Sequence, residues 1–117
     1  MRREALYLDD IVEAGEAIAR FLEGVDRAAF LTSELIQSAV LQKLTVMGEA
    51  VANLPDSLKQ KYPHVPWREI VKFRNAAVHA YFGMNWPLIW ITATQHAPLL
   101  KRDVTAIIAA EGYDADE

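Results

Sequence analysis

An arginine, an asparagine, a histidine and a tyrosine lie within eight residues of one another in the second half of the chain. The stretch "VKFRNAAVHAYFGMNW", residues 71–86, contains Arg74, Asn75, His79 and Tyr81. Polar side chains on an otherwise apolar helix cost free energy unless they are paired with one another, with a partner or with a ligand. Their spacing and their chemistry therefore need an explanation.

Helical geometry divides these four residues between two faces. Successive residues of an α-helix are about 100° apart, so Asn75 and His79 lie side by side. Arg74 and Tyr81 share another face, and roughly 140° separates Arg74 from His79. The two can meet if the arginine bends around the helix. They can also meet if a two-fold dimer brings two copies of the pair into one cleft.

The residue types suit the cleavage of RNA without a metal. A neutral histidine is a natural general base and can take the proton of a 2′-hydroxyl. The planar fork of arginine can hold the negative charge that develops on a phosphoryl group. Asparagine can orient the histidine, and tyrosine can donate a hydrogen bond or stack on a base. The same residue types also form structural hydrogen-bond networks at the edge of a core, so spacing alone leaves both interpretations open.

Composition limits the class of protein. A chain of 117 residues predicts a single domain over residues 1–117. Hydrophobic residues make up 52% of the chain, which leaves apolar surface for contact with a second subunit. Cysteine is absent, which excludes disulfides, thiolate-bound zinc and cysteine nucleophiles.

Charge and hydropathy narrow the environment and the partners. The net charge of −4 disfavours a dedicated duplex-DNA binder, because such proteins neutralise many phosphates. Contact with RNA would need a local basic patch, for which Arg68 and Lys72 beside Arg74 are candidates, and separately Lys101 and Arg102. The amphipathic start and the lack of a long apolar run predict a cytoplasmic protein with no membrane contact.

Apolar periodicity predicts an all-α fold, an antiparallel bundle of four to five helices. We expect long helices at residues 3–22, 33–54, 67–82 and from 86 onward, a short helical turn at 55–62, and a connection at 24–30. Residues 111–117 form an acidic stretch that we expect to be a frayed tail.

Single residues refine these helices. Thr32 or Ser33 is expected to cap the second helix, and Asn85 the last one. Pro98 should kink or split the last helix near His96.

Other chemistry-bearing residues give weaker signals. No two histidines have the four-residue spacing of a helical metal site, and no glycine-rich phosphate loop occurs, so we expect neither metal nor cofactor. Glu49 follows Gly48 in the second helix. It could orient an active-site group or simply face solvent.

The polar stretch is more specific than its spacing. "RNAAVHAYFG" resembles the motif of the HEPN superfamily, an arginine that precedes a histidine by a few residues. The continuation to Tyr81 is similar to the HepT branch, whose motif is Arg-Asn, three residues, His, one residue, Tyr. "MGEAVANLP", "YPHVPWREI" and "LIW" resemble further stretches of that branch. The resemblance covers about residues 35–100.

This resemblance implies a HEPN-like helical bundle that forms a two-fold homodimer. It implies a metal-independent endoribonuclease toxin paired with a minimal nucleotidyltransferase that serves as antitoxin. Arg74 and His79 would be catalytic, and Asn75 would support them. Tyr81 matches the tyrosine that receives AMP from the antitoxin in relatives, and a bulky anionic group there would repel RNA phosphate.

Two positions depart from the family pattern. Gln42 stands where relatives often have arginine, and Asn85 stands where they often have an acidic residue. Together with the acidic net charge, Gln42 leaves a second interpretation open. The chain would then be a non-catalytic helical dimer that binds a nucleotidyltransferase or a nucleotide.

Overall fold

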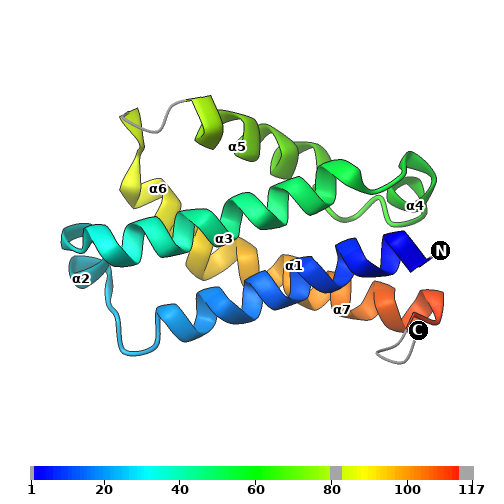
Figure 1. Cartoon of the computed structure of the whole chain (residues 1–117), viewed down its shortest axis with the longest axis horizontal. Coiled ribbons are helices and arrows are strands. Elements are labelled where there is room, and N and C mark those ends of the chain that lie inside the picture. Colours follow the sequence, from blue (N-terminus) through cyan, green and yellow to red (C-terminus); the bar gives the residue numbers. More distant parts are fainter. Residues whose placement is uncertain (1, 80–82, 114–117) are drawn as a thin grey trace.

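A computed structural model describes residues 2–79 and 83–113, and all regular structure within them is helical. In chain order the elements are α1 (Arg2–Phe21), α2 (Arg27–Thr32), α3 (Glu34–Asn53), α4 (Asp56–Lys61), α5 (Trp67–His79), α6 (Trp86–Ile91), the π-helix η2 (Thr92–His96) and α7 (Ala97–Glu111). Figure 1 shows α3 in the middle, with α1 along one side and α5 along the other. The chain of α6, η2 and α7 returns along the bundle, and α7 packs on α1. The predicted all-α bundle is confirmed.

The long helices follow the predicted ranges closely, and residues 80–82 of the helix predicted at 67–82 lie outside the described part. The first connection differs from its prediction. We expected residues 24–30 to be a plain link, and that prediction is wrong, because α2 begins inside it. The Oδ1 of Asp26 accepts a hydrogen bond from the backbone N–H of Ala29 at 2.8 Å and so caps the helix. Six residues are too few for a periodic apolar pattern, and tertiary contacts of Phe30 stabilise this helix instead.

Phe30 connects α2 to two other helices. Its side chain is fully buried, and its ring lies 6.3 Å from the ring of Trp86 and 5.4 Å from that of Trp90, measured between centroids. The backbone carbonyl of Phe30 accepts a hydrogen bond at 3.1 Å from the amide nitrogen of Gln37, which is itself buried. These contacts position the start of α3 relative to α6.

The last helical segment changes its geometry before Pro98, as predicted. Asn85 caps α6, since its Oδ1 accepts a hydrogen bond from the backbone N–H of Leu88 at 3.1 Å. Pro98 has no N–H, and its ring would clash with the carbonyl of Thr94 in a regular α-helix. The helix therefore widens into the π-turns of η2 before α7 begins.

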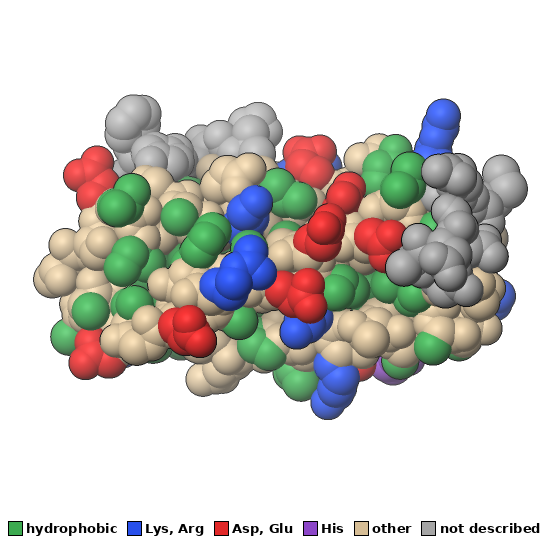
Figure 2. Space-filling view, turned by 60° about the horizontal axis from the view of Figure 1, so that its bottom comes forward, with side chains coloured by type: hydrophobic (Ala, Val, Ile, Leu, Met, Phe, Trp, Pro, Cys, Tyr) green, Lys and Arg blue, Asp and Glu red, His purple; other side chains and the backbone are tan. Residues whose placement is uncertain are grey.

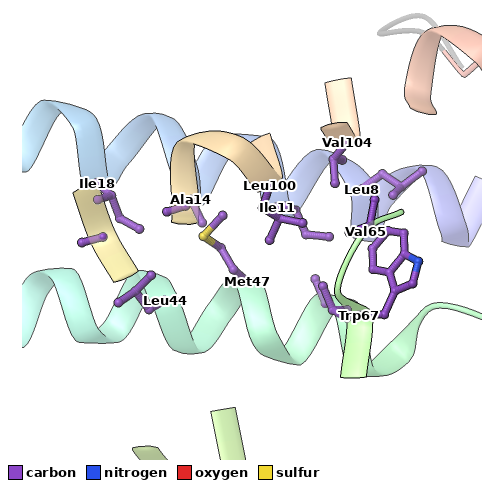
Figure 3. Close-up of a cluster of buried hydrophobic side chains, with 14 of the residues drawn as sticks. Leu8, Ile11, Ala14, Ile18, Leu44, Met47, Val65, Trp67, Leu100 and Val104 are labelled. Atoms are coloured by element: carbon purple, nitrogen blue, oxygen red, sulfur yellow. The ribbon is translucent and has the colours of Figure 1, made fainter. Parts of the chain in front are cut away.

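The core forms where α1, α3 and α7 meet. Figure 3 shows Leu8 and Ile11 of α1 beside Leu100 and Val104 of α7, with Met47 of α3 close to them. These side chains are all at most 7% exposed. Fully burying a residue of this size stabilises the fold by about 1.5–3 kcal/mol, so this contact holds α3 in place between its neighbours.

The surface is mixed in character. On the face turned forward in Figure 2, basic and acidic side chains alternate with hydrophobic ones and do not form a track of one sign. Five large apolar side chains are exposed on the described surface: Leu6, Leu35, Leu88, Ile91 and Leu99. None of the helices, as far as the chain is described, has the length and apolar character needed to cross a membrane.

A polar cluster joins the ends of α4 and α7. Glu111 accepts a hydrogen bond from the hydroxyl of Tyr62 at 2.6 Å and pairs with the ammonium group of Lys61 at 2.7 Å. The hydroxyl of Tyr113 donates to Glu4 of α1 at 2.9 Å. The start of the predicted tail, residues 111–113, is thus held against the bundle, while residues 114–117 lie outside the described part.

This cluster predicts a pH-dependent contribution to stability. The hydrogen bonds from Lys61 and Tyr62 lower the pKa of Glu111. A carboxyl with a lowered folded-state pKa stabilises the fold above its unfolded pKa, about 4.3, and the contribution is lost as the pH falls through the folded value. The Tm of wild type should therefore exceed that of Glu111→Gln at pH 7, and this difference should shrink as the pH falls below about 4.

Thermal unfolding followed by circular dichroism between pH 7 and pH 2.5 measures that difference. Glu13→Gln is the control, because Glu13 is an exposed carboxylate on α1. A Glu111→Gln difference in Tm that stayed constant over the whole pH range would contradict the assignment.

Candidate active site

The helix that carries the polar motif is anchored at its start by Trp67. The indole Nε1 of this buried residue lies 3.2 Å from the carbonyl oxygen of Lys59 and 3.0 Å from that of Tyr62, and donates to both. Pro66 precedes the helix and accepts the first helical hydrogen bond from Ile70 at 3.2 Å. The register of α5 against the rest of the bundle is set at this end.

Arg74 points toward α3. Its side chain is 23% exposed, and its Nη1 donates to the Oε1 of Glu49 at 3.0 Å. The Glu49 side chain is 51% exposed, so this ion pair lies at the surface of the seam between α3 and α5. The sequence allowed two roles for Glu49, and the structure shows that it is both solvent-facing and bonded to the predicted catalytic arginine.

Gly48 makes room for the stem of Arg74. A Cβ atom at position 48 would overlap with the Cβ of Arg74 and would lie 2.8 Å from its Cγ. Glycine in the middle of a helix costs roughly 0.5–1 kcal/mol relative to alanine. The close approach of α5 to α3 at this point therefore depends on a residue that weakens α3 on its own.

The Nε of Arg74 lacks a hydrogen-bond partner in the part of the chain that the structure describes. This nitrogen is buried. Leaving a buried donor without an acceptor costs about 1–3 kcal/mol. A residue that served stability alone would rarely be placed in this way, so the arrangement favours a functional role for the guanidinium.

The other face of α5 is polar and open to solvent. Arg68, Lys72 and Asn75 are all exposed and follow one another at spacings of four and three residues, which forms a stripe along one side of the helix. The stripe carries two positive charges. Asn75 thus lies on the solvent side, away from Arg74, as the helical geometry predicted.

The remaining two motif residues reach the limit of the described chain. His79 is the last residue of α5, and helical register places its position one turn after Asn75. Its side chain lies outside the described residues, and so does the whole of Tyr81. The structure therefore positions Arg74 and Asn75, while the roles of His79 and Tyr81 remain predictions.

A groove of about 450 Å³ runs along the outer side of α3. Tyr7 of α1 and Ala77 of α5 line it from opposite helices, and Gln42, Thr45, Glu49 and Asn53 of α3 lie between them. Gln42, which stands where relatives often have arginine, lines this groove two helical turns before Glu49. Glu49, the partner of Arg74, lines the same groove.

Sequence reasoning did not identify the role of Gly48. The available signal was a glycine in the interior of a strongly apolar helix, where it costs about 1 kcal/mol relative to alanine. The partner of Glu49 could not be found in this way, because Arg74 is 25 residues further along the chain.

Comparison with known proteins assigns the family. Residues 11–107 match the model of the family described as "Ribonuclease HepT-like". This match covers most of the chain, including the motif on α5 and the Gly48–Glu49 pair on α3. The chain belongs to the HepT-like ribonuclease family, as the resemblance of its motif predicted.

Individual relatives agree with this assignment. The chain is 39% identical over 95 residues to "Probable ribonuclease HepT" of Thermococcus cleftensis, which is 81% of this chain and 86% of that protein. It is 35% identical over 109 residues to "Putative RNase MJ1216" of Methanocaldococcus jannaschii, with 92% of this chain and 90% of that protein covered.

A longer relative contains the same region as one part. The chain is 33% identical over 109 residues to "Gamma-glutamylcyclotransferase and putative RNase MJ0434" of Methanocaldococcus jannaschii. The match covers 92% of this chain but only 49% of that protein, so the chain spans about half of its length. No solved structure matches the chain significantly.

The contact between Gly48 and Arg74 gives a direct prediction. Gly48→Ala should destabilise the protein by about 1–3 kcal/mol, because the added methyl group forces α5 away from α3 and overpacking outweighs the gain in helix propensity. Chemical denaturation in urea measures the change.

Gly15→Ala is the matched control. Gly15 is also a helix-interior glycine, and its added Cβ would lie 3.1 Å from the Cβ of Lys101, a tight contact without overlap. We expect this variant to lie within about 1 kcal/mol of wild type. A Gly48→Ala variant as stable as wild type would show that α5 does not need the close approach.

Proposed function

We propose that this protein is a metal-independent endoribonuclease that acts as the toxin of a toxin–antitoxin pair. The observation that carries the proposal is the placement of Arg74, whose guanidinium is held at the surface of the α3–α5 seam by Glu49 and Gly48. Arg74 belongs to the Arg-Asn-x₃-His-x-Tyr motif within the region that matches the ribonuclease family. The names of its relatives support the same activity.

The proposed reaction is an internal transfer at an RNA phosphate. His79 takes the proton of a 2′-hydroxyl, whose oxygen then attacks the adjacent phosphorus. The bond from phosphorus to the 5′-oxygen breaks, and the leaving oxygen takes up a proton. The products are a 2′,3′-cyclic phosphate end and a 5′-hydroxyl end. Arg74 stabilises the extra negative charge on the phosphoryl oxygens, and Asn75 supports His79.

We propose that two copies of the chain form the active unit. Register places positions 74 and 79 of one helix roughly 140° apart, and a two-fold axis allows the arginine of one copy to approach the histidine of the other. The exposed apolar side chains, with Leu35 81% exposed, support a subunit contact. RNA would approach along the stripe formed by Arg68 and Lys72.

We propose further that a minimal nucleotidyltransferase silences the toxin by transferring AMP to Tyr81. The resemblance of "RNAAVHAYFG" to the HepT motif supports this step. An AMP group near the catalytic cleft would exclude RNA by its bulk and by its negative charge.

Replacement of His79 tests the reaction. In buffer with EDTA, wild-type protein should cut labelled RNA and leave 2′,3′-cyclic phosphate ends, and His79→Ala should be slower by on the order of 100- to 10,000-fold, because general-base catalysis is lost. His64→Ala is the matched control, since His64 is an exposed histidine in the link between α4 and α5. Cleavage by His79→Ala at the wild-type rate would rule out the histidine role.

If wild type leaves every RNA intact, tRNA included, the non-catalytic binding module becomes the better interpretation. Such a module would also fail to inhibit growth when it is expressed alone.

Replacement of Arg74 tests the electrostatic role. Arg74→Lys keeps the positive charge but loses the planar fork, so we expect a loss of roughly 100-fold or more in the cleavage rate. Arg20→Lys is the control, because Arg20 is an exposed arginine on α1 away from the motif. Full activity of Arg74→Lys would mean that a simple point charge is enough at this position.

A further inference from the structure

The ion pair between Arg74 and Glu49 adds little to stability. Glu49 is 51% exposed, and exposed pairs of this kind contribute little because solvent screens them and both side chains lose conformational freedom. At the same place in the fold, the Nε of Arg74 is buried without an acceptor among the described residues, which costs stability. Gly48 lowers the helix propensity of α3 but permits the close packing of α5. Packing therefore explains Gly48, but stability does not explain the buried Nε or the exposed ion pair beside it.

Together, Gly48 and Glu49 hold the guanidinium of Arg74 in one orientation. Gly48 and Glu49 are neighbours on α3, and they hold Arg74 at two points, the stem against the backbone of Gly48 and the head by the carboxylate of Glu49. Because the Nε is buried and Nη1 is bonded to Glu49, Nη2 would be the nitrogen that meets a phosphate oxygen.

We propose that Glu49 is a positioning residue for Arg74, which it holds in the orientation needed to meet the phosphoryl group of RNA. The inference rests on the proposed function and adds to it a second residue from another helix. Glu49 does not contact the reacting atoms. Its carboxylate fixes the rotation of the guanidinium plane. A mutation that displaces a catalytic group by about 1 Å can lower the rate by on the order of 100-fold.

The location of the pair favours this role. Glu49 lines the groove along α3, so the bonded end of Arg74 is at the edge of an open surface and not in the sealed core. The carboxylate also restricts the direction from which substrate can approach, because its negative charge repels a phosphate that comes from its side. Substrate would therefore reach the guanidinium from the edge that faces away from Glu49.

Kinetics of two Glu49 variants test the proposal. Glu49→Ala removes the acceptor, and we expect kcat for RNA cleavage to fall by about 10- to 100-fold with little change in KM. Glu49→Gln keeps an acceptor oxygen for Nη1, and we expect it to restore kcat to within a few-fold of wild type. The Tm of both variants should stay within about 5 °C of wild type.

Glu34→Ala is the matched control, because Glu34 is an exposed carboxylate on the same helix and its loss changes the net charge equally. Glu49→Ala kinetics equal to those of Glu34→Ala would overturn the proposal. So would a Glu49→Ala variant that binds RNA more tightly and cuts it faster, since Glu49 would then compete with phosphate for Arg74.

A measurement without RNA separates this proposal from the function on which it rests. Nitrogen-15 NMR of the Arg74 side chain should show slowed rotation of the guanidinium in wild type, and that restriction should be lost in Glu49→Ala. An unchanged signal would overturn the holding role, whatever the activity. Intact RNA with wild type, together with a restricted guanidinium, would instead overturn the ribonuclease proposal and leave the ion pair without a catalytic purpose.

Discussion

The close approach of α5 to α3 at Gly48 is the contact on which the candidate site depends. Only a residue without a Cβ lets the stem of Arg74 lie against α3. This close approach of the two helices allows the guanidinium to bond to Glu49. Trp67 holds the start of the same helix through two backbone carbonyls. With its start and its middle both held, α5 has a defined rotation, and its polar stripe faces solvent.

The charge distribution combines an acidic chain with a local basic stripe on α5. The whole chain carries a net charge of −4, and the face in Figure 2 mixes both signs. On the exposed side of α5, Arg68 and Lys72 follow one another along a single turn, and the exposed Glu69 lies next to Arg68 in the sequence. A local stripe of this kind can guide a phosphate backbone to one edge of the bundle, while the rest of the surface attracts nucleic acid weakly.

Most of the helices could be predicted because each buries one side. The apolar periodicity of α1 and α3 reflects their packing on each other, and Asn85 and Pro98 are local signals that act within a few residues. The helix α2 was missed because six residues show no period, and it is stabilised by the burial of Phe30 against two tryptophans far along the chain. A contact between residues so far apart in the sequence produces no recognisable pattern in the local sequence.

The sequence alone determined the motif, its helix and the family, since these depend on residue types at fixed spacings along one segment. It placed Arg74 and Asn75 on different faces, because an α-helix has a fixed rotation per residue. Only the tertiary structure decided what Arg74 contacts. Its partner Glu49 and its contact Gly48 come from another helix, and the packing of two helices side by side is set by the whole core and not by the spacing within either one.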